Sequence, residues 1–355
     1  MRIAAERREA ILQRARLRGV VRVSDLAEHL GVSTVTVRRD VTALVDEGLL
    51  DRVHGGATLR ASTPGPSRRP ATRASVGMVV PSASYYYPAV IRGAETAAAA
   101  TGVRIVLAIS HYHADEERDQ VARLVKAGVH GLLLSTSEPP DTDPEIGEWV
   151  AGLSLPTVLL ERVGGPAGRG LDYVRTDHAA GARLAVEHLA GAGHRTIALA
   201  AREGSPTTRW LIDGYREAMA ALGLSDGGLP PTLLPRFDND PRRRARHLDG
   251  LIDRCRDGGV TAVLVHVDED AMAFAQTARA RGLDVPRELA IVAYDDEVAA
   301  LAEVPLTAVA PPKLDVGRTA VEVLMRRLCS DDPATQHVSL LPRLVVRASC
   351  GTADR

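Results

Sequence analysis

Short apolar segments alternate with helical patterns from residue 76 onwards, and this alternation most restricts the folds open to the chain. The segments are four to seven residues long and lie at 76–80, 103–109, 131–134, 157–160, 196–200, 262–265 and 289–293. Strands that alternate with helices form βαβ units, whose mostly parallel sheet is buried on both faces. About nine such strands exceed one small domain. The sequence therefore predicts an α/β body with two lobes and parallel sheets.

Unusual residues follow the ends of these predicted strands, where open α/β sheets bind ligands. Aromatic rings stack on the C–H faces of sugars, and charged groups hydrogen-bond sugar hydroxyls in pairs. Each residue also has a structural interpretation, as a helix cap, a core tyrosine or a surface cation. We nevertheless predict a cleft for a polyhydroxylated small molecule. The candidate ligand-binding residues are Tyr85, Tyr86, Tyr87, Glu161, Arg162, Thr207, Arg209, Val267, Asp268 and Asp295.

A helix–turn–helix pattern precedes this body at residues 24–57. Its second helix has one apolar stripe, made of Val37, Val41, Leu44 and Val45, while Arg39 lies on the opposite face. Two amphipathic helices with solvated arginines would look similar, but a basic, glycine-bearing tail at 52–57 can serve as a wing. Arginines can contact phosphates or guanine edges in a major groove. The candidate DNA-binding residues are Ser33, Thr34, Val35, Thr36, Arg38, Arg39, Arg52, His54 and Gly55.

The charge distribution agrees with a DNA-binding N-terminal part. Residues 1–75 contain 14 arginines and 8 acidic residues, whereas the whole chain has a net charge of −1. Basic groups that contact phosphates supply affinity that depends on salt. Residues 61–75 hold three prolines and three arginines with almost nothing apolar, which predicts an extended linker. We thus expect a DNA-binding domain at 1–60, a linker at 61–75 and an effector-binding domain at 76–350.

The N-terminal part resembles the winged helix-turn-helix of the DeoR family. This resemblance implies a recognition helix at 33–39 and a wing at 52–56. It rests on matches at Arg7, Ile11, 25–27, 32–33, 36–40, Leu44, Gly48, Leu50 and 54–57.

The body resembles the ligand-sensing core of the LacI family, which is similar to periplasmic sugar-binding proteins. The resemblance implies two lobes crossed three times by the chain, a ligand in the interlobe cleft, and a homodimer. The matching segments are 76–81, 93–95, 131–133, 156–158, 161–162, Asp177 with Gly181, 193–197, 213–215, 282–286, 292–296, 305–307 and 343–350.

The body departs from the LacI pattern at two ligand positions. Leu211 stands where the family commonly has an effector-clamping arginine, and Val267 stands in place of an asparagine. The leucine-bearing hinge helix is also missing. The effector can therefore be a different sugar, a modified sugar or a non-sugar compound.

We accordingly expect a cytoplasmic transcriptional regulator, preferentially a repressor of carbohydrate genes, that binds operator DNA and a sugar effector. A sugar-phosphate sensor is one alternative, and a sugar-modifying enzyme is a weaker one because the chain lacks GxxxxGK[ST], GxSxG and HExxH motifs. Its three cysteines are widely spaced and form no metal-binding pattern, so we expect no metal and no cofactor. No apolar run approaches the ~20 residues of a membrane span.

Overall fold

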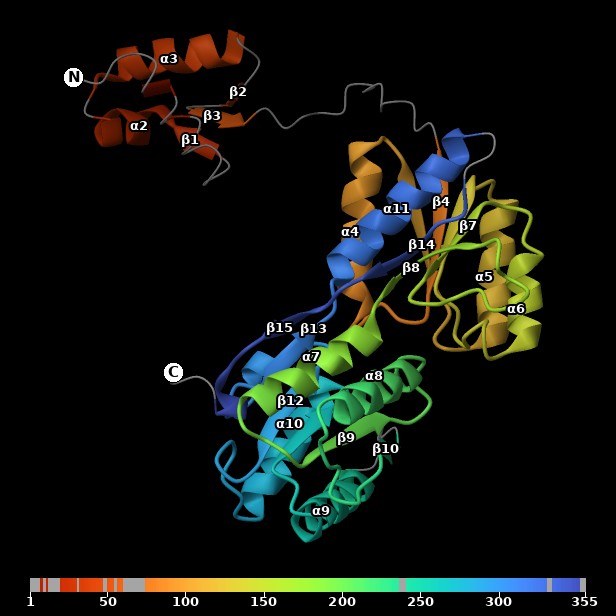
Figure 1. Cartoon of the computed structure of the whole chain (residues 1–355). Coiled ribbons are helices and arrows are strands. Elements are labelled where there is room, and N and C mark those ends of the chain that lie inside the picture. Colours follow the sequence, from red (N-terminus) through yellow and green to blue (C-terminus); the bar gives the residue numbers. More distant parts are fainter. Residues whose placement is uncertain are drawn as a thin grey trace. The chain divides into compact units, whose positions relative to one another are not determined.

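The computed structural model describes residues 7–8, 11, 20–30, 32–46, 50–53, 56–59, 74–235, 241–330 and 334–351 (Figure 1). The chain divides into two compact units, Met1–Ala71 and Thr72–Arg355. The first unit contains the helix-turn-helix pattern, and the second contains the strand–helix alternation. No helix among the described residues has the length and apolar character needed to cross a membrane.

The N-terminal unit packs two helices against a small antiparallel sheet. Helices α2 (Val23–Leu30) and α3 (Thr34–Asp46) accompany strands β1 (Val20–Arg22), β2 (Leu50–Val53) and β3 (Gly56–Leu59). The strand order is β1-β3-β2, and β2 and β3 form an antiparallel hairpin. Of the predicted stripe, Val37, Val41 and Leu44 are buried in the core, and Val45 packs against it partly buried. The hairpin lies where the sequence predicts the wing, and β1 is an addition that the sequence pattern did not indicate.

A buried ion pair fixes the N-terminal segment to α3. The Arg7 guanidinium donates from Nε to Asp40 Oδ2 at 2.9 Å and from Nη2 to Oδ1 at 3.4 Å. Arg8 Nε lies 3.9 Å from the same carboxylate, which is 5% exposed. Asp40 therefore joins segments 33 residues apart in the chain.

We expect Asp40→Asn to destabilise the N-terminal unit by about 2 kcal/mol, because it removes a charge-assisted hydrogen bond and leaves guanidinium charge without its carboxylate. Denaturant unfolding of the full chain, followed by far-UV circular dichroism, should show an earlier transition for this unit alone. An unchanged denaturant midpoint for this transition would mean that the ion pair contributes nothing to the stability of the N-terminal unit.

The first lobe of the larger unit has a six-stranded parallel sheet in the order β14-β8-β7-β6-β4-β5. Helices α4 (Tyr87–Ala100) and α11 (Lys313–Cys329) lie side by side over one face, and α5 (Ala114–Lys126) and α6 (Pro144–Ala151) cover the other (Figure 1). The strands are β4 (Ser75–Val80), β5 (Arg104–Ile109), β6 (Gly131–Leu134), β7 (Thr157–Leu160), β8 (Asp172–Thr176) and β14 (His337–Leu340).

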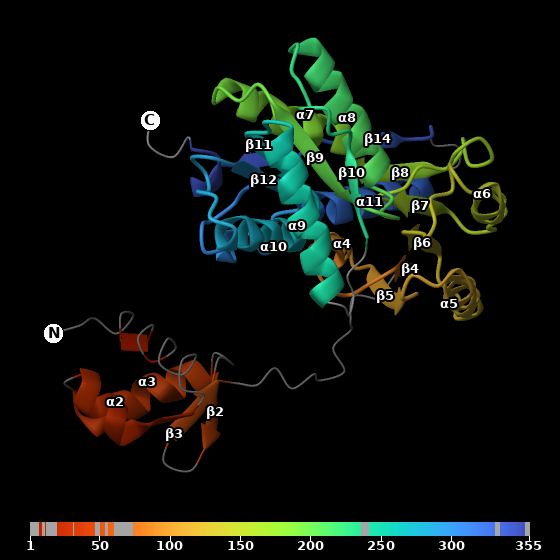
Figure 2. The same cartoon turned by 90° about the horizontal axis from the view of Figure 1, so that it is seen from below.

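The second lobe repeats this layering around a sheet in the order β10-β9-β11-β12-β13-β15, in which only the β13–β15 pair is antiparallel. Helices α7 (His178–Gly191) and α8 (Thr208–Ala221) pack on one face, and α9 (Pro241–Asp257) and α10 (Asp268–Ala280) on the other (Figure 2). The strands are β9 (Ile197–Arg202), β10 (Thr232–Leu234), β11 (Ala262–Val265), β12 (Ala290–Tyr294), β13 (Thr307–Ala310) and β15 (Arg343–Val345), with short 3₁₀ helices η1 (Ala299–Leu301) and η2 (Ala348–Cys350).

The chain crosses between the lobes three times: from β8 to α7, from β13 to α11, and from β14 to β15. This confirms the predicted two-lobed α/β class with parallel sheets. Strand β4 begins at Ser75, so that residue belongs to the sheet and not to the predicted linker. Residues 61–73 of the linker lie outside the described residues.

A close helix contact positions the first lobe's ligand-facing loop. A Cβ added to Gly93 of α4 would lie 2.0 Å from the Leu314 carbonyl oxygen of α11, so only glycine permits this approach. The contact brings the start of α11 near the start of α4, where Lys313 Nζ lies 5.0 Å from the centre of the Tyr86 ring.

Candidate DNA-binding surface and interlobe pocket

The exposed face of α3 carries the predicted base-reading residues. Val35 is 72% exposed, and Arg38 and Arg39 are exposed as well. The helix starts in this register because Ser33 caps it: its Oγ accepts a hydrogen bond from the Thr36 backbone N–H at 3.2 Å. Two guanidinium groups beside an apolar side chain suit phosphates, guanine edges and thymine methyls.

The remaining candidates of this surface are only partly described. Thr34 is exposed at the start of α3, and the Thr36 hydroxyl lies 2.9 Å from Ser33 Oγ. Arg52 lies on β2, but its side chain is outside the described part of the chain, as are His54 and Gly55. The wing contribution to DNA binding therefore stays a prediction.

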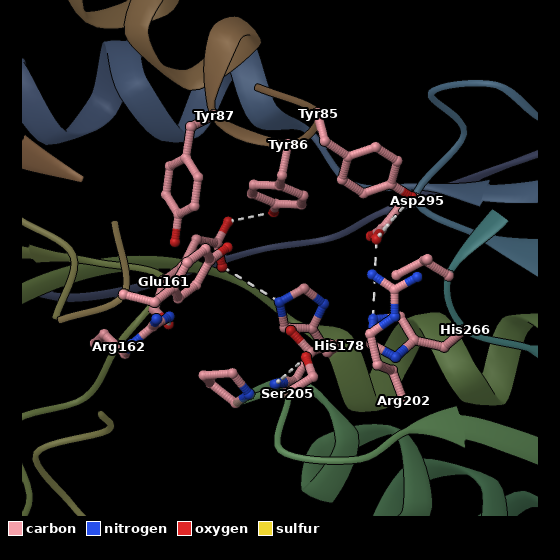
Figure 3. A pocket seen from close by; sticks show the side chains of 14 residues that line it. Tyr85, Tyr86, Tyr87, Glu161, Arg162, His178, Arg202, Ser205, His266 and Asp295 are labelled. Atoms are coloured by element: carbon pink, nitrogen blue, oxygen red, sulfur yellow. Dashed lines mark hydrogen bonds and ion pairs between the residues drawn. The ribbon is translucent and has the colours of Figure 1, made fainter. Parts of the chain in front are cut away.

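A pocket lies between the two lobes, where the carboxyl ends of their strands face each other (Figure 3). Tyrosines form one wall, and charged or imidazole side chains form the opposite one. Its lining residues are Tyr85, Tyr86, Tyr87, Tyr112, Glu161, Arg162, His178, Arg202, Ser205, Pro206, Thr207, His266, Val267 and Asp295.

Backbone strain is concentrated around this pocket. Tyr85, Tyr112, Glu161 and Asp295 have φ angles of 56°, 63°, 54° and 97°, in the left-handed region that residues with a Cβ seldom adopt. Glu161 and Asp295 follow directly on β7 and β12, and Tyr85 and Tyr112 lie in the short loops after β4 and β5. Such strain persists where the surrounding structure imposes it, and it is frequent at ligand-binding sites.

Tyr85 bridges the lobes through its hydroxyl, which donates to Asp268 Oδ1. The same hydroxyl lies 3.3 Å from Asp295 Oδ2 (Figure 3). Burial and then the two aspartates raise the pKa of Tyr85 well above its usual value, so the group remains a donor. The second oxygen of Asp268 accepts from the backbone N–H groups of Glu297, Val298 and Ala299, at 2.6, 2.6 and 3.0 Å. Asp268 is therefore saturated by the protein and holds the loop after Asp295.

Glu161 is a second centre that joins the lobes. Its carboxylate accepts from Tyr86 at 2.7 Å and from the Thr176 hydroxyl and backbone N–H, both at 2.9 Å. His178 Nε2 lies 3.3 Å from Oε2, and His178 Nδ1 lies 3.0 Å from the Tyr294 hydroxyl. Burial alone would raise the pKa of Glu161, but His178 and the hydrogen bonds together lower it to about 2. Glu161 is therefore a permanent anion whose oxygens are occupied.

Asp295 and His266 differ from Asp268 and Glu161, because each has one side-chain polar atom that is available to a ligand. Asp295 and His266 are only 4% and 3% exposed. Nevertheless, Asp295 Oδ1 and His266 Nδ1 have no hydrogen-bond partner among the described residues. Burial, followed by Arg202 and His178, lowers the pKa of His266 to about 3, so its imidazole is neutral. Buried polar groups are normally hydrogen-bonded. These two atoms therefore favour a ligand that supplies hydrogen-bond partners.

The two pocket arginines are held in place by the protein. Arg162 donates from Nε to the Thr136 carbonyl and from Nη1 to the Glu161 carbonyl, both at 2.8 Å. Arg202 donates to Asp270 Oδ2 from Nε at 3.1 Å and from Nη2 at 2.9 Å. Fixed guanidinium groups can orient a polar ligand without first losing side-chain freedom.

The structure brings together eight of the ten predicted ligand-binding residues and leaves two outside the pocket lining. Asp268 lies behind Tyr85, and Arg209 pairs with Asp141 beside a second, smaller cavity. Sequence reasoning overlooked His178 because the preceding strand β8 alternates buried and half-buried residues. It overlooked Arg202 because β9 extends two residues beyond the predicted segment. Tyr112 follows an edge strand, and Ser205, Pro206 and His266 adjoin predicted residues.

No group of three or more His, Cys, Asp or Glu side chains in the described ranges is arranged to hold a metal ion.

Comparison with known proteins gives two domain matches. Residues 7–63 match the DeoR-like helix-turn-helix domain, and residues 186–350 match the periplasmic binding protein-like domain. The arabinose metabolism transcriptional repressor of Geobacillus stearothermophilus is 27% identical, over 86% of this chain and 83% of that protein. The HTH-type transcriptional repressor CytR of Escherichia coli (strain K12) is 27% identical, over 91% of this chain and 93% of that protein.

Among solved structures, the transcriptional regulator CelR–cellobiose complex is similar, with a TM-score of 0.66 and 26% identity over 90% of this chain and 91% of that one. The chain thus joins a DeoR-like helix-turn-helix domain to a periplasmic-binding-protein-like domain, and its relatives are LacI-family transcriptional repressors.

Proposed function

We propose that this chain is a sequence-specific DNA-binding repressor of carbohydrate uptake or metabolism genes, and that a small sugar-like effector in the interlobe pocket switches its DNA affinity. The observation that carries the proposal is the combination within one chain of a DeoR-like module and a ligand pocket between two lobes. The exposed Arg38 and Arg39 supply the DNA contacts, together with the predicted wing.

The pocket chemistry supports a polyhydroxylated effector. Tyr85 and Tyr86 offer aromatic surfaces, while Asp295 Oδ1 and His266 Nδ1 offer unused hydrogen-bonding atoms. Ring faces pack on sugar C–H groups, and carboxylates accept from hydroxyls. The names of the relatives agree with this class of effector, since one is an arabinose metabolism repressor and another is a complex with cellobiose.

The switch we propose is closure of the cleft within a homodimer. Contacts that already cross between the lobes include Tyr85 to Asp268, Glu161 to His178, and Lys313 to Glu297. An effector that binds Asp295 and the tyrosines would add to these contacts and favour the closed arrangement. Through the dimer, closure would change how two DNA-binding units fit two half-sites. Such coupling is typically ~1–3 kcal/mol, or roughly 5–150-fold in affinity.

We assign a binding role, and no catalytic role, to the Glu161 carboxylate. Glu161 is ionised and hydrogen-bonded to Thr176 and Tyr86, so it has no proton to give to a leaving group. A general acid in glycoside hydrolysis instead needs a raised pKa and a free proton. This arrangement favours a fixed acceptor that shapes the site.

Footprinting of the full-length protein on DNA upstream of its own gene tests the proposal. We expect protection of two related half-sites, and a changed protection pattern when arabinose, cellobiose or another effective sugar is added. The direction of that change shows whether the effector releases or promotes binding. Absence of specific protection at any salt concentration that permits DNA binding would contradict the proposed function.

A further inference from the structure

A second cavity adjoins the interlobe pocket and has a different chemistry. The two cavities share Glu161, Arg162, His178, Pro206 and Thr207, so they lie next to each other. Beyond the shared residues, the second cavity is lined mainly by Arg175 of β8 and by Arg209 and Trp210 of α8. Its distinguishing feature is therefore guanidinium groups contributed by both lobes.

The two additional arginines lie close to one indole ring. The Arg175 guanidinium carbon lies 4.5 Å from the centre of the Trp210 ring, and that of Arg209 lies 4.4 Å from it. Arg209 also forms an ion pair with Asp141 of the first lobe. Trp210 thus brings two cations together at the boundary between the lobes, although like charges repel each other.

The charge of Arg175 is not balanced by a side chain in the described part of the molecule. Its Nε and Nη1 are buried without a hydrogen-bond acceptor, and so is Arg209 Nε. Glu161 is the nearby carboxylate of this cavity, but its oxygens already accept from Tyr86 and Thr176. Stacking on an indole stabilises a cation, yet it leaves the N–H donors unsatisfied. A buried N–H donor without an acceptor is costly unless something else supplies one.

We infer that this cavity binds an anionic group of the effector, with Arg175 as its main ligand and Arg209 as the second. The group is a phosphate monoester or a carboxylate, because both present oxygen pairs that match guanidinium donors. The polyhydroxylated part of the same effector then lies between the tyrosines and Asp295. This inference rests on the proposed function, which it deepens by specifying an acidic sugar derivative.

Inorganic phosphate tests the site without knowledge of the natural effector. The chain has two tryptophans, so a full-length Trp149→Phe variant reports on Trp210 alone. We expect its fluorescence to change saturably with millimolar phosphate, and not with potassium chloride at equal ionic strength. Adding Arg175→Gln should abolish the saturable change. Arg183→Gln is the matched control, because Arg183 pairs with Glu217 and lines neither cavity.

Calorimetric titration with matched compounds distinguishes the two anions. Glucose, glucose 6-phosphate and gluconate, and the corresponding ribose series, are compared on wild type and Arg175→Gln. The variant should bind only the anionic members more weakly, by about tenfold or more, as expected when a charge-assisted hydrogen bond is removed. A preference for phosphorylated compounds identifies a phosphate site, and a preference for acids identifies a carboxylate site.

Several results would overturn the inference. One is a phosphate response that equals the chloride response or that survives Arg175→Gln. Another is an equal loss of affinity for neutral and anionic sugars in that variant. If no sugar of the panel binds, the phosphate titration alone decides. Specific DNA protection combined with no phosphate response would reject the anion site while leaving the proposed repressor function intact.

Discussion

Replacing both Arg38 and Arg39 with alanine should weaken operator binding by about 100-fold, since each guanidinium contact to a base or phosphate contributes about 1–3 kcal/mol. Both side chains are exposed on α3, so their removal should leave the core of Val37, Val41 and Leu44 intact. The slope of log affinity against log salt should also fall, by about one for each DNA phosphate that an arginine no longer neutralises. Gel-shift titrations at several salt concentrations measure both effects.

The matched control is Arg123→Ala/Lys126→Ala, which removes two exposed positive charges from the last turn of α5 in the larger unit. It should change operator affinity little, because these cations lie outside the DNA-binding unit. Circular dichroism should show the same helix content in both variants. An Arg38/Arg39 variant that is folded and retains wild-type affinity would contradict the assignment of α3 as the recognition helix.

Asp295→Asn should weaken effector binding and, at the same time, raise the stability of the unliganded protein. The amide is nearly the same size and can still accept from Tyr85, but it removes the charge that we expect effector hydroxyls to contact. We predict about tenfold or greater loss of effector affinity, because hydrogen bonds to charged groups are the stronger ones. A higher effector concentration should therefore be needed to change operator affinity. Gel-shift titrations measure this with a sugar that is active in the footprint.

The same substitution should stabilise the unliganded protein at neutral pH. Burial, and then the Asp268 charge against the opposing effect of Lys313, raise the pKa of Asp295 from 3.8 to about 6. Between these values the unfolded chain has lost the proton while the folded chain keeps it, so stability falls as pH rises through the window. The penalty is complete above pH 6 and amounts to at most about 3 kcal/mol. Asp295→Asn removes it.

Thermal unfolding at two pH values checks this expectation. At pH 8 the Asp295→Asn variant should melt about 5 °C or more above wild type, and near pH 4 the difference should vanish. Asp213→Asn is a suitable control, because Asp213 is exposed on α8 outside the pocket. A destabilised variant at pH 8 would show that the Asp295 charge supports the fold and is not held ready for a ligand.

Local patterns in the sequence were sufficient to predict helix α3 and most of the central strands. In α3 the apolar spacing fixes which face is buried, and Ser33 fixes where the helix starts. The segments 131–134, 157–160 and 262–265 coincide with β6, β7 and β11, since continuous apolar runs are typical of strands buried on both faces. The α/β class and the two lobes follow from these strands.

Strands without such a run were not predicted. Strand β8 reads DYVRT and β14 reads HVSL, both with alternating exposure, and β14 forms the edge of its sheet. Strands β10 and β15 have only three residues, and β13 reads TAVA, in which valine is the one large apolar residue. Their hydrogen bonds to neighbouring strands define them, and a neighbour distant in the chain cannot be read from local periodicity.

By itself, the sequence determined helix α3 and its buried face, the α/β class and the strand ends at which the pocket forms. Only the tertiary structure decided what each polar side chain does there. It saturates Asp268 and Glu161 with protein donors, leaves Asp295 Oδ1 and His266 Nδ1 unused, and places Arg175 beside Trp210 with its Nε and Nη1 lacking an acceptor. The reason is physical: residue type fixes which hydrogen bonds a side chain can make, whereas availability for a ligand depends on partners brought from distant segments.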